Sequence, residues 1–506
     1  MIRFNCDYQE GAHPRIMQAL METNMEQTIG YGEDAYCEAA RKMIKEVCNC
    51  PQAAVHFLVG GTQAYLTVIA SILRPHQAVL CAKEGHINVH ETGAIEACGH
   101  KVMALEGRDG KVSGDLIREA YKLHWEDGAH EHITQPKLVY ISNPTELGTI
   151  YSKAELEDIR RACDECHMYL FLDGARLGYG LMSKENDLTM EDIAKNCDVF
   201  YIGGTKVGAL FGEAVVITNP ALQEDFRYII KQKGGMLAKG RLLGIQFLEL
   251  FKDGLYFEIS GHAMKMAELL KDGLLKLGYE FYANSPTNQQ FVIVSNEKLK
   301  ELEENFSYEP MQAYGEDKRV VRFCTSWATK EEDVRALLEA MNRFEFRDIL
   351  PEEADQAATI EQICFPPHEA CSEAMMKERV AKVSELFLVA VDKETGKIAG
   401  FLNGLATDEK GFRDEFFKDS GLHNPTGSYV MLCGLDVLPQ YRGQGLATEI
   451  MQQYIQRETQ RGRKQLILTC LEEKISMYEK MGYRNNGIAN STWGNEEWYE
   501  MIYELD

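Results

Sequence analysis

A carboxylate and a lysine follow two apolar runs in the first part of the chain. Asp173 stands where one apolar run ends, in Phe171-Leu172-Asp173-Gly174-Ala175-Arg176. Lys206 stands just after the next run, in Tyr201-Ile202-Gly203-Gly204-Thr205-Lys206. Open α/β sheets bind their ligands outside the carboxyl ends of such strands. A lysine there can form an imine with an aldehyde cofactor if its pKa is lowered. A nearby carboxylate can keep a pyridine nitrogen protonated, which makes the ring an electron sink.

Two motifs earlier in the chain add a phosphate cradle and an imidazole. Val59-Gly60-Gly61-Thr62-Gln63 turns from a strand into a helix, where bare backbone amides can hold a phosphate. The imidazole of His86, in Gly85-His86-Ile87-Asn88-Val89-His90-Glu91, is a ring that could stack on a cofactor. The order and spacing of the four motifs together indicate an enzyme that uses pyridoxal phosphate.

A second kind of chemistry is indicated near the end of the chain. One stretch of the sequence ends a strand and begins an amphipathic helix. It reads Leu435-Asp436-Val437-Leu438-Pro439-Gln440-Tyr441-Arg442-Gly443-Gln444-Gly445-Leu446-Ala447. The amides of Arg442 to Ala447 would converge at that helix N-terminus, where the helix dipole favours a pyrophosphate. Gly443 and Gly445 permit a close backbone approach.

The elements that position the first set of motifs alternate between apolar runs and helix-period segments. Strands are predicted at Ala54–Val59, Ala78–Cys81, Lys137–Ser142, Met168–Asp173, Val199–Gly203 and Ala214–Thr218. Helices are predicted at Thr62–Leu73, Lys153–Glu165 and Met190–Lys195, and a longer helical stretch, Gly240–Leu255, leads into Glu258–Leu277. This alternation predicts an α/β layer with a mostly parallel sheet and a smaller lobe after it.

A new series of predicted strands and helices begins around Arg343-Phe344-Glu345-Phe346-Arg347. The tail has its own predicted strands and helices, at Phe387–Val391, Ile398–Leu405, Tyr429–Val437, Gln465–Cys470, Ala447–Arg461 and Ser476–Met481. We therefore predict two domains, residues 1–343 and residues 344–506.

Composition narrows the classes of function. The chain has 506 residues, with 54 basic and 78 acidic side chains and a net charge of −24, so it lacks a general electrostatic footprint for nucleic acid or anionic lipid. The sequence has no apolar run of ~18 residues and no visible secretory signal. Its 14 cysteines form no framework and fit reduced thiols, which predicts a cytoplasmic protein. The Cys163/Cys166 pair is interpreted as helix packing, and no metal site is predicted.

Residues 1–343 resemble low-specificity threonine aldolases of the type I pyridoxal phosphate fold, within the β-eliminating lyase group. The resemblance rests on Gly30-Tyr31-Gly32-Glu33-Asp34, Gly60-Gly61-Thr62, Gly85-His86-Ile87, Leu172-Asp173-Gly174-Ala175-Arg176 and Gly204-Thr205-Lys206. It implies that Lys206 is the Schiff-base lysine, Asp173 the partner of the pyridine nitrogen and His86 the stacking ring. It further implies that Gly61 and Thr62 bind phosphate, that Arg176 lies beside the cofactor and that Arg322 binds the substrate carboxylate.

The implied reaction is cleavage of a β-hydroxy amino acid, such as threonine, to glycine and an aldehyde. The chain departs from the family pattern in two places. Cys6 stands where many members have a serine, and Ser142-Asn143-Pro144-Thr145-Glu146 stands where they have a second histidine. The base for the β-hydroxyl proton is therefore open between Glu146 and His86 acting through a water.

Residues 344–506 resemble the GCN5-related N-acetyltransferases (GNAT), an α+β fold that binds acetyl-CoA. The resemblance rests on Arg442-Gly443-Gln444-Gly445-Leu446-Ala447 and on Ser476-Met477-Tyr478-Glu479, and the latter looks closest to the arylalkylamine branch. It implies that Arg442, Gly443, Gly445 and Ala447 hold the pyrophosphate, that the backbones of Leu435 and Val437 bind the pantetheine arm, and that Tyr478 protonates the leaving thiolate. That branch has histidines where this chain reads Met431-Leu432-Cys433, so the base is open between a water chain and an acidic side chain such as Asp436.

Taken together, the sequence predicts a bifunctional enzyme for small molecules: an aldolase-type lyase fused to an N-acetyltransferase for a small amine or amino acid. Three alternatives remain for the first half, namely β-elimination, transamination, and a binding half without turnover. Neither nucleic acid nor a membrane is expected as a partner. The resemblance implies a homodimer or homotetramer.

Overall fold

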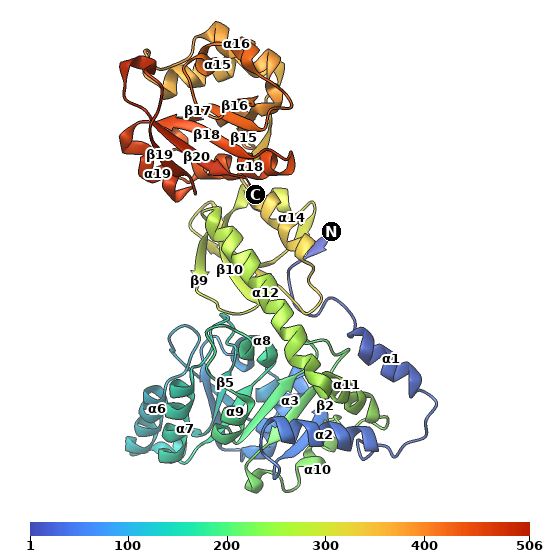
Figure 1. The fold of residues 1–506 in the computed structure, drawn as a ribbon. Coiled ribbons are helices and arrows are strands. Elements are labelled where there is room, and N and C mark those ends of the chain that lie inside the picture. Colours follow the sequence, from blue (N-terminus) through green and yellow to red (C-terminus); the bar gives the residue numbers. More distant parts are fainter. Residues whose placement is uncertain (506) are drawn as a thin grey trace. The chain divides into compact units, whose positions relative to one another are not determined.

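The chain divides into two compact units, Met1–Met341 and Asn342–Asp506. A computed structural model, drawn in Figure 1, describes residues 1–505. Each unit has its own sheets and its own buried apolar core, and each is described by itself. Among the described residues, no helix is both long enough and apolar enough to cross a lipid bilayer.

A seven-stranded sheet forms the centre of the first unit. In spatial order its strands are β2 (Ala54–Leu58), β8 (Glu213–Ile217), β7 (Val199–Gly203), β6 (Tyr169–Asp173), β5 (Gln135–Ser142), β3 (Gln77–Ala82) and β4 (Lys101–Leu105). Strand β8 is antiparallel to both of its neighbours, and the other pairs are parallel. The six predicted strands are confirmed, with small changes at their ends.

Helices cover both faces of this sheet, which explains why its strands are almost continuously apolar. Side chains of Leu170 and Leu172 on β6 enter the core formed with α7 (Lys153–Glu165) and α9 (Met190–Asn196). The side chain between them, Phe171, points to the other face and packs in the core formed with α3 (Gly61–Ile72). This is the alternation that a pleated strand imposes.

The remaining helices of the first unit flank these layers or connect them. They are α1 (Pro14–Glu22), α2 (Ala35–Val47), α4 (His86–Val89), α5 (Ala94–Ala97), α6 (Gly114–Glu126), α8 (Leu177–Leu181), α10 (Phe226–Gln232), α11 (Arg241–Phe251), α12 (Leu255–Lys276), α13 (Asn296–Leu302) and α14 (Glu331–Met341).

The predicted helical stretch Gly240–Leu255 is interrupted before its end. Helix α11 stops at Phe251 and α12 starts at Leu255, because Asp253 and Gly254 adopt left-handed backbone angles, with φ of 56° and 74°. A left-handed residue ends a right-handed helix. Figure 1 shows α12 running from the large sheet to the small lobe of the first unit.

The small lobe is built on a four-stranded antiparallel sheet. Its order is β12 (Glu309–Tyr314), β13 (Lys318–Cys324), β10 (Gln289–Ser295) and β9 (Glu280–Ala283). The chain's N-terminal strand β1 (Ile2–Arg3) pairs with β11 (Phe306–Ser307), which ties the first residues to this lobe. Residues 5–7 therefore follow directly from the small lobe.

The second unit is a mixed seven-stranded sheet with helices on its faces. The strand order is β14 (Phe344–Asp348), β15 (Phe387–Asp392), β16 (Lys397–Thr407), β17 (Tyr429–Val437), β18 (Gln465–Cys470), β20 (Tyr499–Glu504) and β19 (Arg484–Ile488). The longer helices are α15 (Ala354–Cys364), α16 (Glu373–Lys382) and α18 (Leu446–Gln460), and the shorter ones are α17 (Glu415–Lys418) and α19 (Ile475–Lys480). The strands and helices predicted for the tail are confirmed, whereas β19 and β20 were not predicted.

One strand pair in this sheet separates partway along its length. Strands β17 and β18 are parallel, but they pair only from Tyr429↔Gln465 to Met431↔Ile467. Opposite this point β17 shifts its register against β16, at Asn403 and Gly404. The later halves of β17 and β18 therefore diverge, and they leave a slot between two strand backbones.

Candidate active sites

The four motifs of the first unit meet at one edge of the large sheet. Strands β6 and β7 are parallel neighbours, so Asp173 at the end of β6 and Lys206 after β7 lie at the same edge. Strands β2 and β3 run in the same direction, which brings Gly61 and His86 there as well. Topology alone thus assembles residues that are far apart in the chain.

Lys206 lies among charged side chains of both signs. Burial lowers the pKa of its ammonium, and the nearby Arg176 guanidinium lowers it further, whereas the carboxylates of Asp7, Asp173 and Glu213 oppose this change. Within the described residues, no hydrogen bond or ion pair holds its Nζ. A lysine in this state has a free, more nucleophilic amine for an aldehyde.

Asp173 is held in place through both of its carboxylate oxygens. It is buried; its Oδ1 accepts a hydrogen bond from the Ala175 amide at 2.8 Å, and its Oδ2 accepts one from the Tyr140 hydroxyl. Each carboxylate oxygen has a further lone pair. The group can therefore still accept a proton-bearing ring nitrogen.

Arg176 forms a bidentate ion pair that the sequence analysis missed. Its Nε and Nη2 donate to the two carboxylate oxygens of Asp7, at 2.7 and 3.1 Å, and Asn288 donates to the same carboxylate at 2.9 Å. Burial would raise the pKa of Asp7, but the charges of Arg176 and Lys206 outweigh it and lower the pKa to about 2. Asp7 and Arg176 are 169 residues apart, so no local pattern could have paired them.

His86 begins α4 and lies against an aromatic ring and a buried acid. Its ring centroid is 5.6 Å from that of Tyr65, and its Nδ1 lies 2.8 Å from an oxygen of the buried Glu91. The imidazole therefore lies against both an aromatic ring and a buried carboxyl group.

Glu146 is the second acidic group beside His86. Its Oε1 accepts hydrogen bonds from the His86 backbone amide at 2.8 Å and from the Ser142 hydroxyl at 2.7 Å. Burial raises the pKa of Glu146, and the nearby Asp173 raises it further, whereas these two hydrogen bonds lower it. Both candidate bases for the β-hydroxyl proton therefore lie next to each other in the structure.

The predicted phosphate cradle is the N-terminus of α3. No side chain caps this helix, and a Cβ added at Gly60 would meet nothing within 4 Å. Gly61 is half-buried and Thr62 is exposed, so their amides can be reached from outside. An uncapped helix N-terminus with open space in front of it suits a phosphate.

Arg322 reaches the site from the small lobe. It lies on β13, where its Nη1 donates to Gln289 at 3.2 Å and its Nη2 donates to the Asn5 carbonyl at 3.0 Å. Its Nε is buried without a partner. The charge of Arg322 also contributes to lowering the pKa of His90, after burial and the effect of His86, so the arginine lies near the His86–His90 segment. An unpartnered guanidinium nitrogen is available to a carboxylate.

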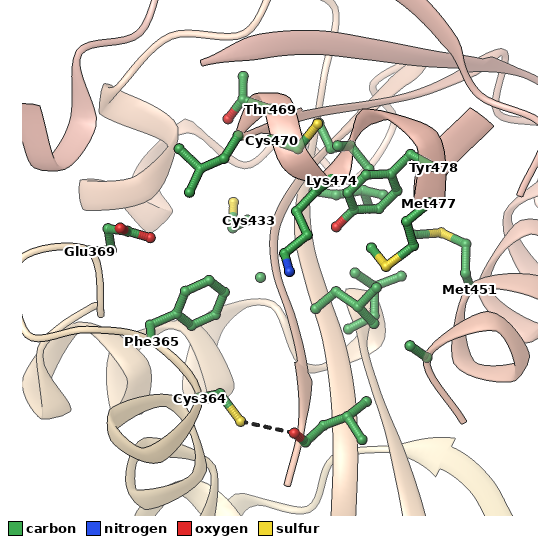
Figure 2. Close-up of a pocket in the computed structure, with 18 of the residues that line it drawn as sticks. Cys364, Phe365, Glu369, Cys433, Met451, Thr469, Cys470, Lys474, Met477 and Tyr478 are labelled. Carbon is green, nitrogen blue, oxygen red and sulfur yellow. Dashed lines mark hydrogen bonds between the residues drawn. The ribbon is translucent and has the colours of Figure 1, made fainter. Parts of the chain in front are cut away.

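The second unit contains a cavity of about 620 Å³ at the slot between β17 and β18. Leu435 and Val437 line one side of the slot, and Leu468 and Cys470 line the other. Figure 2 shows Tyr478 and Met477 on one wall and Cys364 and Phe365 opposite them, with the Lys474 amine pointing into the space between.

The predicted pyrophosphate site closes one end of this cavity. Gly443 and Gly445 have left-handed angles, with φ of 74° and 85°, and an added Cβ at either would meet nothing within 4 Å. Helix α18 starts after Gly445 without a side-chain cap, and Ala447 in its first turn lines the cavity. The Arg442 side chain folds back, so that its Nε donates to the Val437 carbonyl at 2.9 Å. The Arg442 amide donates to the Pro439 carbonyl at 3.3 Å, so an anion here would be left to the amides that follow it in the motif.

Tyr478 lies on α19 with its hydroxyl turned toward the cavity (Figure 2). Burial raises the pKa of this phenol above its ordinary value, and the neighbouring Cys470 and Asp436 raise it further. The hydroxyl thus stays protonated and can donate a proton.

Comparison with known proteins assigns a family to each unit. The family model for β-eliminating lyases matches residues 5–297, and the model for the acetyltransferase (GNAT) family matches residues 354–483. The chain belongs to the β-eliminating lyase family. It joins a threonine aldolase-like lyase unit to a GNAT acetyltransferase unit.

Comparison with individual proteins shows which enzymes the first unit is similar to. A low-specificity L-threonine aldolase from a Pseudomonas species is 30% identical over 345 residues, which is 66% of this chain and 95% of that protein. The solved threonine aldolase of Leishmania major is 47% identical, with a TM-score of 0.66, over 67% of this chain and 98% of its own. An aspartate aminotransferase of Thermus thermophilus, 17% identical with a TM-score of 0.52 over 68% of this chain and 91% of its own, shares the fold.

The residues present fit the cofactors of both families. The lyase family depends on pyridoxal phosphate, and GNAT domains use acetyl-CoA. In the first unit, the unpaired Lys206 amine, the buried Asp173 carboxylate and the uncapped start of α3, with open space at Gly60, match an aldehyde, a ring nitrogen and a phosphate. In the second, the slot and the uncapped start of α18 match a pantetheine arm and a pyrophosphate.

Proposed function

We propose that the first unit cleaves β-hydroxy amino acids to glycine and an aldehyde, and that the second acetylates a small amine. The lyase proposal depends chiefly on Lys206, whose amine is unpaired and whose pKa is lowered by burial and by Arg176, beside the carboxylate of Asp173. The likeness to threonine aldolases supports this choice of reaction.

We assign roles in the lyase reaction to this chain's own residues. Lys206 attaches the cofactor, Asp173 holds the proton of its ring nitrogen, and Gly61 and Thr62 bind its phosphate. When bound, pyridoxal phosphate supplies an electron sink for the cleaved Cα–Cβ bond. Arg322 orients the substrate carboxylate, and either His86 or Glu146 takes the proton of the β-hydroxyl group.

Aldehyde release from threonine tests the lyase proposal. Wild type with pyridoxal phosphate should produce acetaldehyde from threonine, and Lys206→Ala should lose both this product and the visible absorption of bound cofactor. The exposed Lys184 offers a matched control, since Lys184→Ala should retain both. Absence of product from threonine, allo-threonine and phenylserine would contradict an aldolase.

The acetyltransferase proposal depends on the cavity between the diverging β17 and β18 and on the open amides at the start of α18. Thiol release from acetyl-CoA, measured against a panel of amines, tests it. Wild type should respond to at least one amine, and Arg442→Ala should weaken acetyl-CoA binding. Thiol release that no amine stimulates, together with unchanged binding in the variant, would contradict it.

β-Elimination is the second candidate for the lyase unit, because the matching family model is that of β-eliminating lyases. The same bound cofactor supports it when a leaving group sits on Cβ. Incubation with serine separates the two reactions, since elimination yields ammonia and pyruvate whereas aldol cleavage yields glycine and formaldehyde.

A further inference from the structure

Two buried carboxyl groups of the second unit have oxygens without a hydrogen-bond donor. Asp436 on β17 is fully buried, and neither of its oxygens has a partner among the described residues. Glu361 on α15 is also buried; its Oε1 accepts from the Cys371 amide at 3.0 Å, but its Oε2 has no partner. Buried carboxylates without partners are costly, so an arrangement of this kind calls for a function.

The free oxygens of both groups converge on one glycine. A Cβ added at Gly434 would lie 3.2 Å from Asp436 Oδ2 and 3.5 Å from Glu361 Oε2. Gly434 and Glu361 both line the cavity, whereas Asp436 lies behind them. The lack of a side chain at residue 434 leaves the two carboxyl groups exposed to each other.

A buried guanidinium beside the pair determines its charge. Arg379 on α16 is buried; its Nη1 donates to Asn403 at 2.7 Å and its Nη2 to the Phe417 carbonyl at 2.9 Å, while its Nε has no partner. One guanidinium and two carboxyl groups are electrically neutral when the carboxyl groups share one proton, as close acidic pairs do.

The pKa directions agree with one shared proton. Burial raises the pKa of Asp436 well above its ordinary value, and Glu361 raises it further. Burial also raises the pKa of Glu361, whereas the hydrogen bond from the Cys371 amide, the charge of Arg379 and the neighbouring Asp436 lower it. Of the two groups, only Glu361 accepts a hydrogen bond from a backbone amide, that of Cys371, so we place the negative charge on Glu361 and the shared proton on Asp436. The other titratable groups that interact with the pair are Cys364, Cys371, Cys433 and Tyr478.

We propose that Glu361 is the proton acceptor of acetyl transfer and that protonated Asp436 is its positioning residue. This assignment rests on the acetyltransferase function proposed above and specifies its substrate as an amine that arrives as the ammonium ion. The residues of β17 that line the cavity, Leu432, Cys433, Gly434, Leu435 and Val437, include no carboxyl group. Glu361 and Tyr478 both line this cavity.

The step balances in protons and electrons. The ammonium gives one proton to Glu361, and the neutral amine nitrogen then attacks the carbonyl carbon of acetyl-CoA. As the C–N bond forms, the C–S bond breaks and its electron pair leaves on the thiolate. Tyr478 protonates the thiolate and recovers a proton from the new amide nitrogen, and Glu361 later releases its proton to solvent.

The test compares the pH dependence of amine-stimulated thiol release in the full chain. Glu361→Gln and Asp436→Asn are the test variants, and Glu345→Gln is the control, because Glu345 on β14 is an exposed acid outside the cavity. Glu361→Gln should lower kcat by about 100-fold or more at neutral pH, the usual contribution of a general base. The loss should shrink as the pH rises, because solvent then deprotonates the amine. Asp436→Asn should move the pH midpoint, and acetyl-CoA affinity should stay unchanged in all three variants.

An infrared measurement gives a reading that does not depend on activity. The infrared difference spectrum between wild type and Asp436→Asn at neutral pH should show the carbonyl band of one buried protonated carboxyl group, and the difference spectrum between wild type and Glu345→Gln should lack it. If Glu361→Gln and Asp436→Asn both keep the pH profile of the wild type, the roles assigned to these two residues are overturned, whereas the acetyltransferase proposal is not. A wild-type protein that acetylates no amine would overturn both, even with the band present.

Discussion

Asp7 and Arg176 show how single side chains of the first unit depend on each other. Asp7 is buried and the Arg176 side chain is 13% exposed, and two hydrogen bonds join the carboxylate to the guanidinium. Arg176 also contributes to the lowered pKa of Lys206. A change at Asp7 therefore affects both stability and the reactive lysine.

We expect Asp7→Asn to lower the free energy of unfolding of the first unit by about 3–5 kcal/mol, because it leaves a largely buried guanidinium without its counter-charge. Urea unfolding of the full chain measures this. Asp253→Asn, which removes an exposed partner of Arg15, should change the value by less than about 0.5 kcal/mol.

The same pair predicts acid sensitivity. The folded-state pKa of Asp7 is about 2, below the ordinary 3.8, so its stabilising contribution is complete above the ordinary value. It is lost as the pH falls from there toward 2. Wild type should therefore lose more stability than Asp7→Asn over that range, and equal losses would contradict the pairing.

Glu213 is a buried acid that the sequence analysis did not single out. It accepts hydrogen bonds from the Thr205 hydroxyl at 2.9 Å and the Gly204 amide at 3.1 Å, directly before Lys206. Burial raises its pKa to about 8, against the effects of Thr205 and Lys206. Glu213 is therefore neutral at low pH and supports the Lys206 ammonium only at higher pH.

For Glu213→Gln we expect faster uptake of pyridoxal phosphate by the cofactor-free chain above a pH of about 8, and wild-type rates below about 7. The physical reason is that the ionised wild-type Glu213 keeps more of Lys206 protonated. Stopped-flow absorbance measures the rate, with the exposed-helix variant Glu126→Gln as control. A difference confined to acidic pH would contradict this role.

At the scale of elements, the second site depends on where two strands separate and where one helix begins. Strands β17 and β18 diverge after Met431, and α18 begins directly after the left-handed Gly445. Both features lie on the chain segment that contains the Arg442–Ala447 motif. The backbone at Gly445, more than any side chain, thus determines the direction of the amides.

We expect Gly445→Ala to weaken acetyl-CoA binding by about 10-fold, since a left-handed alanine costs about 1–2 kcal/mol and the turn relaxes away from that geometry. Isothermal titration measures the affinity. Gly487→Ala is the matched control, because Gly487 has φ of 95° with the same open surroundings but lies on β19, outside the cavity. Equal loss of affinity in both variants would indicate general destabilisation instead.

At the scale of the whole molecule, an exposed apolar surface on the first unit suggests a second copy of the chain. Met21, Met25 and Ile29 are 75%, 88% and 70% exposed, on α1 and the segment that follows it. The His13 amide, just before α1, donates to the Gly208 carbonyl in the loop after Lys206. We therefore propose a homodimer or homotetramer in which this surface is covered and supports the lyase site.

We expect the double variant Met21→Glu/Met25→Glu to shift the mass measured by light scattering to that of a monomer. Aldehyde release should fall with it, whereas acetyl-CoA binding should not change. Leu275→Glu on α12, where the leucine is 52% exposed, is the control and should retain the wild-type mass. An unchanged mass in the double variant would place the interface elsewhere.

The sequence by itself determined the class of each half, most of the strands, and the motifs that line both sites. Continuous apolar runs specify buried strands, and glycines at strand–helix turns specify anion cradles, because these signals are local. Only the tertiary structure decided the pairs Asp7–Arg176 and Glu361–Asp436 and the position of Glu213 beside Lys206. Their partners are distant in the chain or lie on neighbouring strands, and a carboxyl group's protonation state depends on burial and neighbours that no local pattern contains.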